Sequence, residues 1–406
     1  MWNDRLEKLG AGPFDRLRSL LTPIEPPAGV EPIVMSIGEP AHPYPEFVGE
    51  VMHANRHLYD KYPPILGTAE YRLAVADWLT RRYDLPAGMI EPDRHIVPLA
   101  GTREGLFLMA SVVVPETTSV GGRNMKPAVL LPNPMYQVYL GAAVFSGADP
   151  VYVPCTRETG FLPDLSQVPE GDLERAAMVF VCTPSNPQGA IADIDQICEM
   201  IHLARKHDFL LVVDECYAEV YDTAPPPGAL EACLKIGGAP DEIMRNVAIF
   251  HSLSKRSSVP GLRVGFAAGD PEIMAKYAMV RAYSSAQVPL PVYAAGAALW
   301  RDEEHVVTNR KLYREKFDIA ERVLGGRFDF YRPEGGFFLW LNVGDGEEAT
   351  LRLWRDAGLR VAPGGYLSRT DANGVNPGDA YIRVALVLDA AKTEIALQRI
   401  ADTLGR

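Results

Sequence analysis

His251-Ser-Leu-Ser-Lys-Arg-Ser-Ser-Val-Pro-Gly-Leu-Arg-Val-Gly-Phe266 joins two short apolar runs, Val247–Phe250 and Val264–Ala267. Apolar runs of this length, bounded by turn residues, are typical of buried strands. Lys255 follows the first run among small side chains, which is an unusual position for a surface lysine. Burial and nearby cations lower the pKa of a lysine, and its neutral amine can then attack a carbonyl. The stretch therefore predicts a reactive lysine at the end of a strand.

The same stretch also carries groups that bind a phosphate. Arg256 and Arg263 supply the cations that would lower the pKa of the lysine, and Ser252 and Ser254 supply hydroxyls. Hydroxyls, backbone N–H groups and an arginine fork are what a phosphate monoester requires. A Schiff-base amine beside a phosphate site suggests pyridoxal phosphate, whose aldehyde and phosphate need both. The alternative is a basic surface loop after a strand.

The chain on either side alternates between short apolar runs and helical segments. Two of these helical segments are 104–114 and 193–207. This alternation indicates an α/β fold with a mostly parallel sheet. The seven strand-like runs are Ile96–Val97, Ala128–Leu131, Asp149–Val153, Met178–Val181, Leu210–Val213, Val247–Phe250 and Val264–Ala267.

The remainder of the chain predicts a second, smaller α+β domain. Residues 290–325 read as one long helical region, and strands and helices follow it. We expect an N-terminal arm that includes part of the small domain (1–44), a large cofactor-binding domain (45–295) and a small C-terminal domain (296–406). We further expect one helix over Asp4–Leu21 and loose inserts at Thr117–Lys126 and Asp371–Asp379.

The composition of this 406-residue chain disfavours several classes of partner. A net charge of −12 argues against nucleic acid and anionic membrane surfaces. The five cysteines are scattered without a Cys-x-x-Cys pair, so neither a disulfide framework nor a cysteine zinc site is indicated. The N-terminus lacks the apolar segment of a secretory signal, and no apolar run approaches the roughly 20 residues of a membrane span. We therefore expect a cytoplasmic protein.

Two further strand ends carry polar residues that suit the ring of such a cofactor. Asp214 follows a buried run directly, and Tyr217 lies three residues further on. A carboxylate at the carboxyl edge of a sheet can pair with the pyridine nitrogen and keep it protonated. Asn186, in the loop after another strand, can donate to the phenolic oxygen. The alternatives are a helix N-cap for the aspartate and an ordinary turn for the asparagine.

A glycine-rich helix start and a nearby aromatic residue add weaker signals. Gly101, Thr102 and Arg103 open a helix, whose free N–H groups and dipole favour an anion. Tyr136 follows a strand and two prolines, where it can stack on a flat ring. Taken singly, an ordinary helix start and core packing explain these residues as well.

Arg383 lies inside the apolar run 381–386. A buried arginine needs an anion, and a substrate carboxylate can accept its two parallel hydrogen bonds. The alternative is an arginine on an edge strand that faces water.

No metal site is indicated. His53 and His57 are four residues apart, but the residues between them lack the glutamate of the zinc-protease motif, so we expect solvated helix residues. The chain also lacks a Walker loop, a Gly-x-Gly-x-x-Gly after a strand and the elbow of serine hydrolases.

These motifs occur in an order that resembles the class I/II aminotransferases of fold type I. The order is the Asn186 loop, Asp214-x-x-Tyr217, Ser252-x-Ser-Lys255 with Arg263 eight residues on, and the late strand with Arg383. The resemblance covers nearly the whole chain. It implies pyridoxal 5′-phosphate as cofactor, glutamate as amino donor, a keto acid as acceptor, and a homodimer with sites at the subunit interface.

The resemblance also implies a role for each matching residue. Lys255 would bond to the cofactor aldehyde and carry protons. Asp214 would pair with the pyridine nitrogen, and Asn186 and Tyr217 would bond to the phenolic oxygen. Tyr136 would stack on the ring.

Phosphate and substrate ligands follow from the same resemblance. The phosphate would be held by Gly101, Thr102, Arg103, Ser252 and Arg263. Arg383, with Asn186, would bind the α-carboxylate of the substrate, and Gly38 would line the entrance. Tyr62 would reach the phosphate bound in the neighbouring subunit.

Within the class, the sequence of several segments is most similar to that of the bacterial N-succinyldiaminopimelate aminotransferases. The supporting segments include Ser36-Ile-Gly-Glu-Pro-Ala-His-Pro-Tyr-Pro45 and Gly374-Val-Asn-Pro-Gly378. Such enzymes move an amino group between glutamate and N-succinyl-2-amino-6-oxopimelate, in lysine and diaminopimelate synthesis. The catalytic motifs are common to other aminotransferases, so this expectation depends on the peripheral segments.

Other functions remain open. One is an aminotransferase for aspartate, alanine or aromatic substrates, and another is a pyridoxal-phosphate C–S β-lyase. A regulator on this fold would need a DNA-binding domain, and only about 30 residues precede Ile33; a cofactor-free structural protein is the last alternative. Candidates for contact with the distal end of the acceptor are Arg281, Tyr283 and Ser284, for which an ordinary surface position is the alternative.

Overall fold

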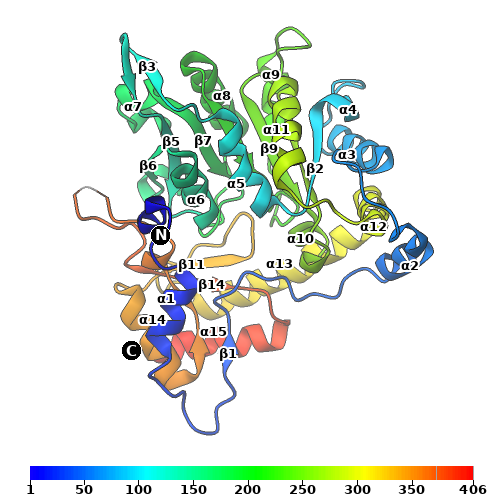
Figure 1. Cartoon of the computed structure of the whole chain (residues 1–406). Helices are drawn as coiled ribbons and strands as arrows, with labels where there is room; N and C mark the ends of the chain where they lie inside the picture. Colours follow the sequence, from blue (N-terminus) through cyan, green and yellow to red (C-terminus); the bar gives the residue numbers. More distant parts are fainter. Residues whose placement is uncertain (372, 406) are drawn as a thin grey trace.

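A seven-stranded sheet forms the larger part of the molecule (Figure 1). The computed structural model describes residues 1–371 and 373–405. The strand order is β2-β10-β9-β8-β7-β5-β6, with β10 antiparallel to both neighbours and all other pairs parallel. The predicted mostly parallel seven-stranded sheet is therefore confirmed. Its strands are β2 (Ile96–Leu99), β5 (Ala128–Asn133), β6 (Asp149–Pro154), β7 (Ala176–Cys182), β8 (Leu210–Asp214), β9 (Val247–Ser252) and β10 (Gly265–Gly269).

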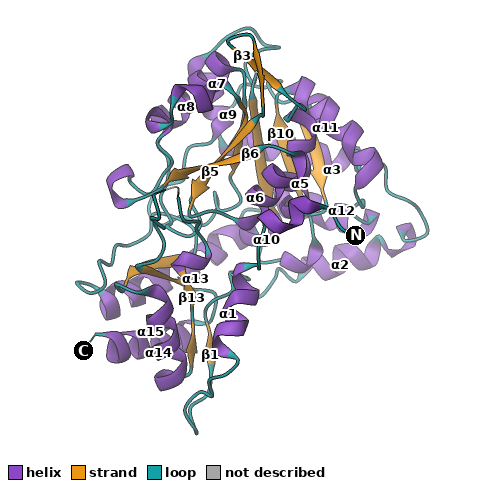
Figure 2. Cartoon of the chain, turned by 60° about the vertical axis from the view of Figure 1, so that its left-hand side comes forward, coloured by secondary structure: helices purple, strands orange, loops and turns teal. Residues whose placement is uncertain are grey.

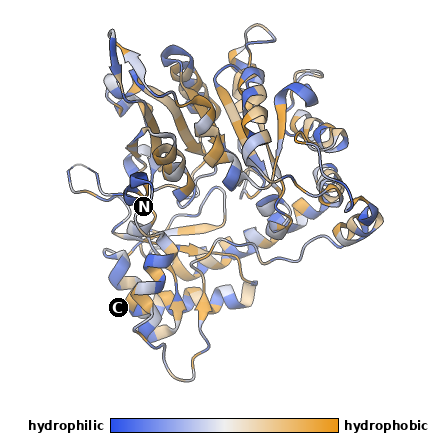
Figure 3. Ribbon diagram, viewed as in Figure 1, coloured by the Kyte–Doolittle hydropathy of each residue, from blue (hydrophilic) through white to orange (hydrophobic). Residues whose placement is uncertain are grey.

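Helices cover both faces of this sheet (Figure 2). Alternate side chains of a strand point to opposite faces, so Leu210 and Val212 pack in one core while Leu211 and Val213 pack in the other. A strand buried on both sides must be apolar throughout, as the hydropathy colours of these strands show (Figure 3). One face carries α5 (Thr102–Val113), α6 (Gln137–Ser146) and α11 (Pro271–Ser284); the other carries α3 (Ala69–Arg82), α8 (Ile194–His207), α9 (Ala229–Ile236) and α12 (Leu290–Arg301).

A smaller α+β part follows the large sheet. Its antiparallel sheet has the order β11-β14-β13, and the parallel pair of β1 and β12 brings the N-terminal segment beside it. No helix within 1–371 and 373–405 is long and apolar enough to cross a membrane. The domain boundaries at 44/45 and 295/296 stay a prediction. The elements are β1 (Ile33–Val34), α13 (Glu304–Leu324), β11 (Phe338–Asn342), α14 (Gly346–Ala357), β12 (Leu359–Arg360), β13 (Ala362–Pro363), β14 (Tyr381–Ala385) and α15 (Ala390–Leu404). Shorter helices are α2 (Phe47–Ala54), α4 (Pro92–His95), α7 (Glu170–Glu174) and α10 (Leu253–Arg256).

Two helices predicted as continuous are divided. The N-terminal one consists of a 3₁₀ turn, Asp4–Lys8, and α1 (Pro13–Leu21), because Gly10 takes a φ of 64° that ends the first piece. The region 290–325 is interrupted at Asp302 and Glu303, and the Asp302 carboxylate accepts from the backbone N–H of His305 in the first turn of α13.

The insert 117–126 is a hairpin, not a loose loop. Strands β3 (Thr118–Val120) and β4 (Arg123–Met125) pair across Gly121 and Gly122, both of which have positive φ. Two such glycines are typical of the tight turn that matches the twist of the strands. The other predicted insert, 371–379, includes position 372, which lies outside the described residues.

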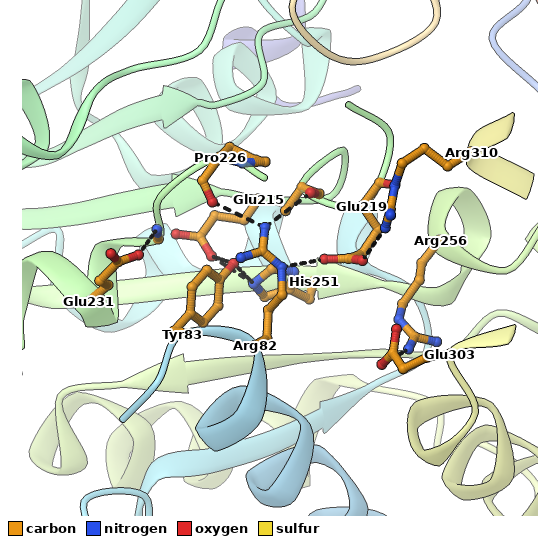
Figure 4. Close-up of polar contacts among 12 residues, drawn as sticks. Arg82, Tyr83, Glu215, Glu219, Pro226, Glu231, His251, Arg256, Glu303 and Arg310 are labelled. Carbon is orange, nitrogen blue, oxygen red and sulfur yellow. Dashed lines mark hydrogen bonds and ion pairs between the residues drawn. The ribbon is translucent and has the colours of Figure 1, made fainter. Parts of the chain in front are cut away.

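Buried charges tie the large sheet to α13 (Figure 4). Glu219, in the loop after β8, accepts from Arg82 Nε at 2.5 Å and from Arg310 Nη2 at 3.0 Å. Beside it, the buried carboxylate of Glu215 accepts from the Tyr83 hydroxyl at 2.9 Å and contacts His251 Nε2 at 2.6 Å. Paired polar and charged groups therefore fix the ends of β8 and β9.

Glu219→Gln should lower the free energy of unfolding by about 3 kcal/mol, because two largely buried guanidinium groups would lose their counter-charge. Urea denaturation at one protein concentration measures this. The matched control is Asp195→Asn, which breaks an exposed pair with Lys235 and should cost about 0–1 kcal/mol. Equal losses in the two variants would contradict a stabilising role for the buried cluster.

Candidate active site

A cavity of about 500 Å³ lies where the large sheet meets the smaller part. Asp214 ends β8 and Ser252 ends β9, so both lie at the carboxyl edge of the sheet, where open α/β sheets bind ligands. Lys255 follows on α10, and Arg383 enters from β14. All four residues line the cavity.

The amine of Lys255 is buried in the wall of the cavity. Its Nζ donates to the backbone carbonyl of Gly38 at 2.7 Å. Burial lowers the pKa of Lys255 from 10.5 to about 8, and the positive charges of Arg383 and Arg263 act in the same direction. Arg256 has no special role expected at this site, and its guanidinium points away to Leu299 O and Glu303.

Asp214 is a buried carboxylate at the floor of the cavity. It accepts from the Tyr139 hydroxyl at 2.7 Å and from the Cys216 N–H at 3.2 Å. Burial nevertheless raises the pKa of this carboxyl group. A protonated ring nitrogen facing Asp214 would restore the carboxylate, so the residue suits a pyridinium partner. No helix begins at Asp214, so the N-cap alternative is wrong.

A phosphate cradle lies at the N-terminus of α5. Gly101 has a φ of 88°, and a Cβ there would lie 2.1 Å from Arg263 Nη2, so only glycine lets the guanidinium lie across this backbone. Arg263 donates to Pro260 O and forms no ion pair with a carboxylate of the described chain. The Ser252 and Thr102 hydroxyls complete the wall. An uncompensated cation at a helix N-terminus fits a phosphate monoester.

Arg383 is a buried cation without a carboxylate partner in the described residues. Its side chain is 4% exposed, and β14 lies between β11 and β13, so the edge-strand alternative is wrong. It donates to Asn186 Oδ1 at 3.0 Å and to Ser36 O at 2.8 Å, while its Nε has no partner. Burial lowers the pKa of Arg383 to about 10. A buried guanidinium without an anionic partner suits a substrate carboxylate.

The remaining predicted ring and entrance residues also meet at this cavity. Tyr136, Asn186, Tyr217 and Gly38 line it, and the Tyr136 hydroxyl accepts from Arg103 Nε at 2.7 Å. Tyr217 packs against the rings of two phenylalanines on the small-sheet side, Phe337 and Phe338.

Four other predicted positions lie away from the cavity. Tyr62 is 100% exposed, and its contact with a neighbouring subunit stays a prediction. Arg281 is fully buried against Glu104 at 2.8 Å, so it is not free to read the distal end of a substrate. Tyr283 and Ser284 are exposed and are not part of the cavity wall.

The two histidines considered for metal binding are exposed. α2 ends at Ala54, so His53 and His57 do not share one helix. No group of three metal-binding side chains occurs in the part of the chain that the structure describes.

Several residues of the cavity were missed by sequence reasoning, among them Tyr139 and Arg369. Tyr139, on α6, is indistinguishable in sequence from a core aromatic residue. Arg369 lies in the turn after β13 and resembles an ordinary loop arginine. Neither has a local signal, because only contacts between distant segments bring them to the site.

Fold and cavity together, with a buried lysine, a buried carboxylate and cations that no carboxylate of the described chain pairs with, are those expected of a pyridoxal-phosphate enzyme of fold type I. The sequence profile described as "Aminotransferase class I and II" matches residues 30–400. The chain belongs to this family, whose members depend on pyridoxal phosphate.

Three relatives illustrate the similarity. The LL-diaminopimelate aminotransferase of Desulforudis audaxviator (strain MP104C) is 31% identical, over 99% of this chain and 97% of that protein. A solved aminotransferase from Neisseria meningitidis Z2491 is 38% identical with a TM-score of 0.92, covering 99% of this chain and 100% of that one. A probable N-succinyldiaminopimelate aminotransferase from Thermus thermophilus is 26% identical with a TM-score of 0.81, covering 99% and 100%.

The rate at which the apoprotein captures pyridoxal phosphate should rise with pH through about 8, because only the neutral amine of Lys255 reacts. At pH 8 roughly half of such amines are neutral, against roughly 0.3% for an ordinary lysine. Stopped-flow absorbance of the bound cofactor measures the rate. Nα-acetyl-lysine, which has a free ε-amine, is run in the same buffers and corrects for the titration of the cofactor itself. A midpoint near that of Nα-acetyl-lysine would contradict the desolvated amine.

Proposed function

We propose that this aminotransferase carries an amino group from L-glutamate to N-succinyl-2-amino-6-oxopimelate. The products are 2-oxoglutarate and N-succinyl-LL-2,6-diaminopimelate, in lysine and diaminopimelate biosynthesis. The membership of the family supports the reaction class. The diaminopimelate names of two relatives support the carbon skeleton.

The positive charge of the cavity wall favours the succinylated acceptor over free diaminopimelate. Apart from the Lys255 amine, the charged side chains of the wall are mostly cationic: Arg103, Arg263, Arg369 and Arg383, against Glu39 and Asp214. Free diaminopimelate presents a distal ammonium group that needs an acid. A succinyl amide removes that positive charge and adds a carboxylate, which suits a cationic wall.

Each residue has a task that follows from its position. The Arg383 fork holds the α-carboxylate and so orients the substrate. Lys255 Nζ, when neutral, accepts the proton from the substrate Cα. Asp214 keeps a positive charge at the ring nitrogen, and the bound cofactor supplies the electron sink for the pair released from the C–H bond.

A glutamate-dependent assay tests the substrate. We expect N-succinyl-2-amino-6-oxopimelate to give a kcat/KM at least about 10-fold above that of its acetylated analogue, oxaloacetate and pyruvate. A second candidate is free LL-diaminopimelate, favoured by the name of the Desulforudis relative. It is tested in the reverse direction, with 2-oxoglutarate as acceptor, beside N-succinyl-LL-2,6-diaminopimelate as the other donor. A higher kcat/KM for the free diamine would overturn the succinyl assignment. Pyruvate released from cystathionine would instead indicate a lyase.

Asp214→Ala should lower kcat by at least about 100-fold, because the charge that stabilises the transition state is lost. The dissociation constant of glutamate should change far less, since Arg383 remains. Steady-state kinetics and equilibrium dialysis measure the two quantities, with Asp195→Ala as the surface control. An unchanged kcat would refute the role of Asp214.

We also propose a homodimer. The segment 56–67 exposes the large side chains of Tyr59, Tyr62 and Ile65. Exposed aromatic and aliphatic side chains that cluster in this way are typical of interfaces. Sedimentation velocity should give twice the mass of one chain, and a single-chain mass would contradict the dimer.

A further inference from the structure

Arg369 is a cavity cation to which the proposed reaction gives no individual task. Its Nη1 donates to Ser368 O at 3.1 Å and its Nη2 to Leu9 O at 3.4 Å, a long contact. Within the described chain it forms no ion pair with a carboxylate. Carbonyl oxygens leave the positive charge of a guanidinium uncompensated, so the group has capacity for an anion.

The backbone of Arg369 is held in place by the large sheet. Asn133, at the end of β5 and 1% exposed, accepts from the Arg369 N–H at 2.9 Å. Its amide also donates to the Arg369 carbonyl at 2.8 Å. Two residues away along each segment, the Met135 N–H donates to Leu367 O at 3.0 Å. The guanidinium therefore extends from a fixed point, as a preorganised binding group requires.

The other cations of the wall are already assigned. Arg263 lies across Gly101 at the phosphate cradle, and Arg103 bonds to Tyr136. Arg383 is the anchor for the α-carboxylate. Arg369 is thus left for a second anionic group on the substrate.

The surroundings of Arg369 suit the chain that connects two carboxylates. Phe14 of α1, Tyr366 and Leu367 line the cavity beside it. These side chains offer apolar surface to the methylene groups of a substrate, while the guanidinium of Arg369 supplies the positive charge. Arg369 lines both this cavity and a neighbouring hollow, and the hollow is also lined by Leu9 and Ser368, whose carbonyls accept from the guanidinium.

We propose that Arg369 binds the carboxylate of the substrate that lies farthest from the reacting carbon, and so makes this site selective for diacids over monoacids. The inference depends on the proposed function only in requiring a substrate with a distal carboxylate, which glutamate itself possesses. A purely structural role, fixing the N-terminal segment through Leu9, is the competing explanation.

Binding of two unreactive acids to the holoenzyme tests the proposal. Glutarate carries a distal carboxylate, and pentanoate has the same chain length without one. In Arg369→Gln the dissociation constant of glutarate should rise on the order of 10- to 100-fold, as for other lost charge pairs, while that of pentanoate changes less than about 3-fold. Arg369→Lys should recover part of the glutarate affinity, since it restores the charge without the fork.

The matched control is Arg399→Gln. Arg399 is also half-buried and also donates only to carbonyls, those of Glu31 at 2.9 Å and Ala357 at 3.0 Å, but it lies outside the cavity. Isothermal titration calorimetry measures both acids. Single-turnover absorbance with glutamate and norvaline extends the comparison to amino donors. In Arg369→Gln the rate with glutamate should fall, while the rate with norvaline should not.

Equal weakening of glutarate and pentanoate in Arg369→Gln would show a structural role and overturn the proposal, as would unchanged binding of both. The outcome is separate from that of the proposed function. The wild-type enzyme could fail to convert N-succinyl-2-amino-6-oxopimelate while Arg369→Gln selectively weakens glutarate binding. That result would refute the proposed acceptor and support the role of Arg369. The reverse pattern refutes Arg369 alone.

Discussion

Desolvation of the Lys255 amine is the constraint on which the rest of the site depends. The amine is held by one carbonyl, that of Gly38, and by the aromatic faces of Tyr217 and Phe337. None of these groups carries a negative charge, and burial of the amine outweighs their attraction for an ammonium group, so the pKa of Lys255 falls to about 8. The chemistry of the enzyme requires that neutral form. Any change that opens the cavity to water would return the lysine toward its ordinary pKa.

The cations of the cavity serve two purposes at once. Arg263 and Arg383 are proposed to bind a phosphate and a carboxylate, and their positive charges also lower the pKa of Lys255 nearby. These residues come from the large sheet and from β14, and the carbonyl of Gly38 comes from the N-terminal segment. The site therefore exists only when distant parts of the chain are assembled. Buried pairs such as Glu219 with Arg310 maintain that assembly.

Much of the fold was predictable because the signals are local. A strand buried on both faces must be continuously apolar, so the run ending in Asp214 indicated both a strand and the edge where a ligand binds. The helix break at Asp302 and Glu303 spans only two residues and was missed. Arg256 is adjacent to Lys255 in sequence, but adjacent side chains on a helical turn point in different directions, and its guanidinium pairs with Glu303. Arg369 is positioned at the cavity by two hydrogen bonds from its backbone to Asn133, which is distant in sequence, so no local pattern reveals it.

The central claim is that Lys255 is the residue that bonds to the cofactor. Borohydride reduction of the purified holoenzyme, followed by proteolysis and mass spectrometry, locates the bond directly. We expect a pyridoxyl group on the peptide that contains Lys255 and on no other lysine. A stable pyridoxyl group on another lysine, with Lys255 unmodified, would contradict it.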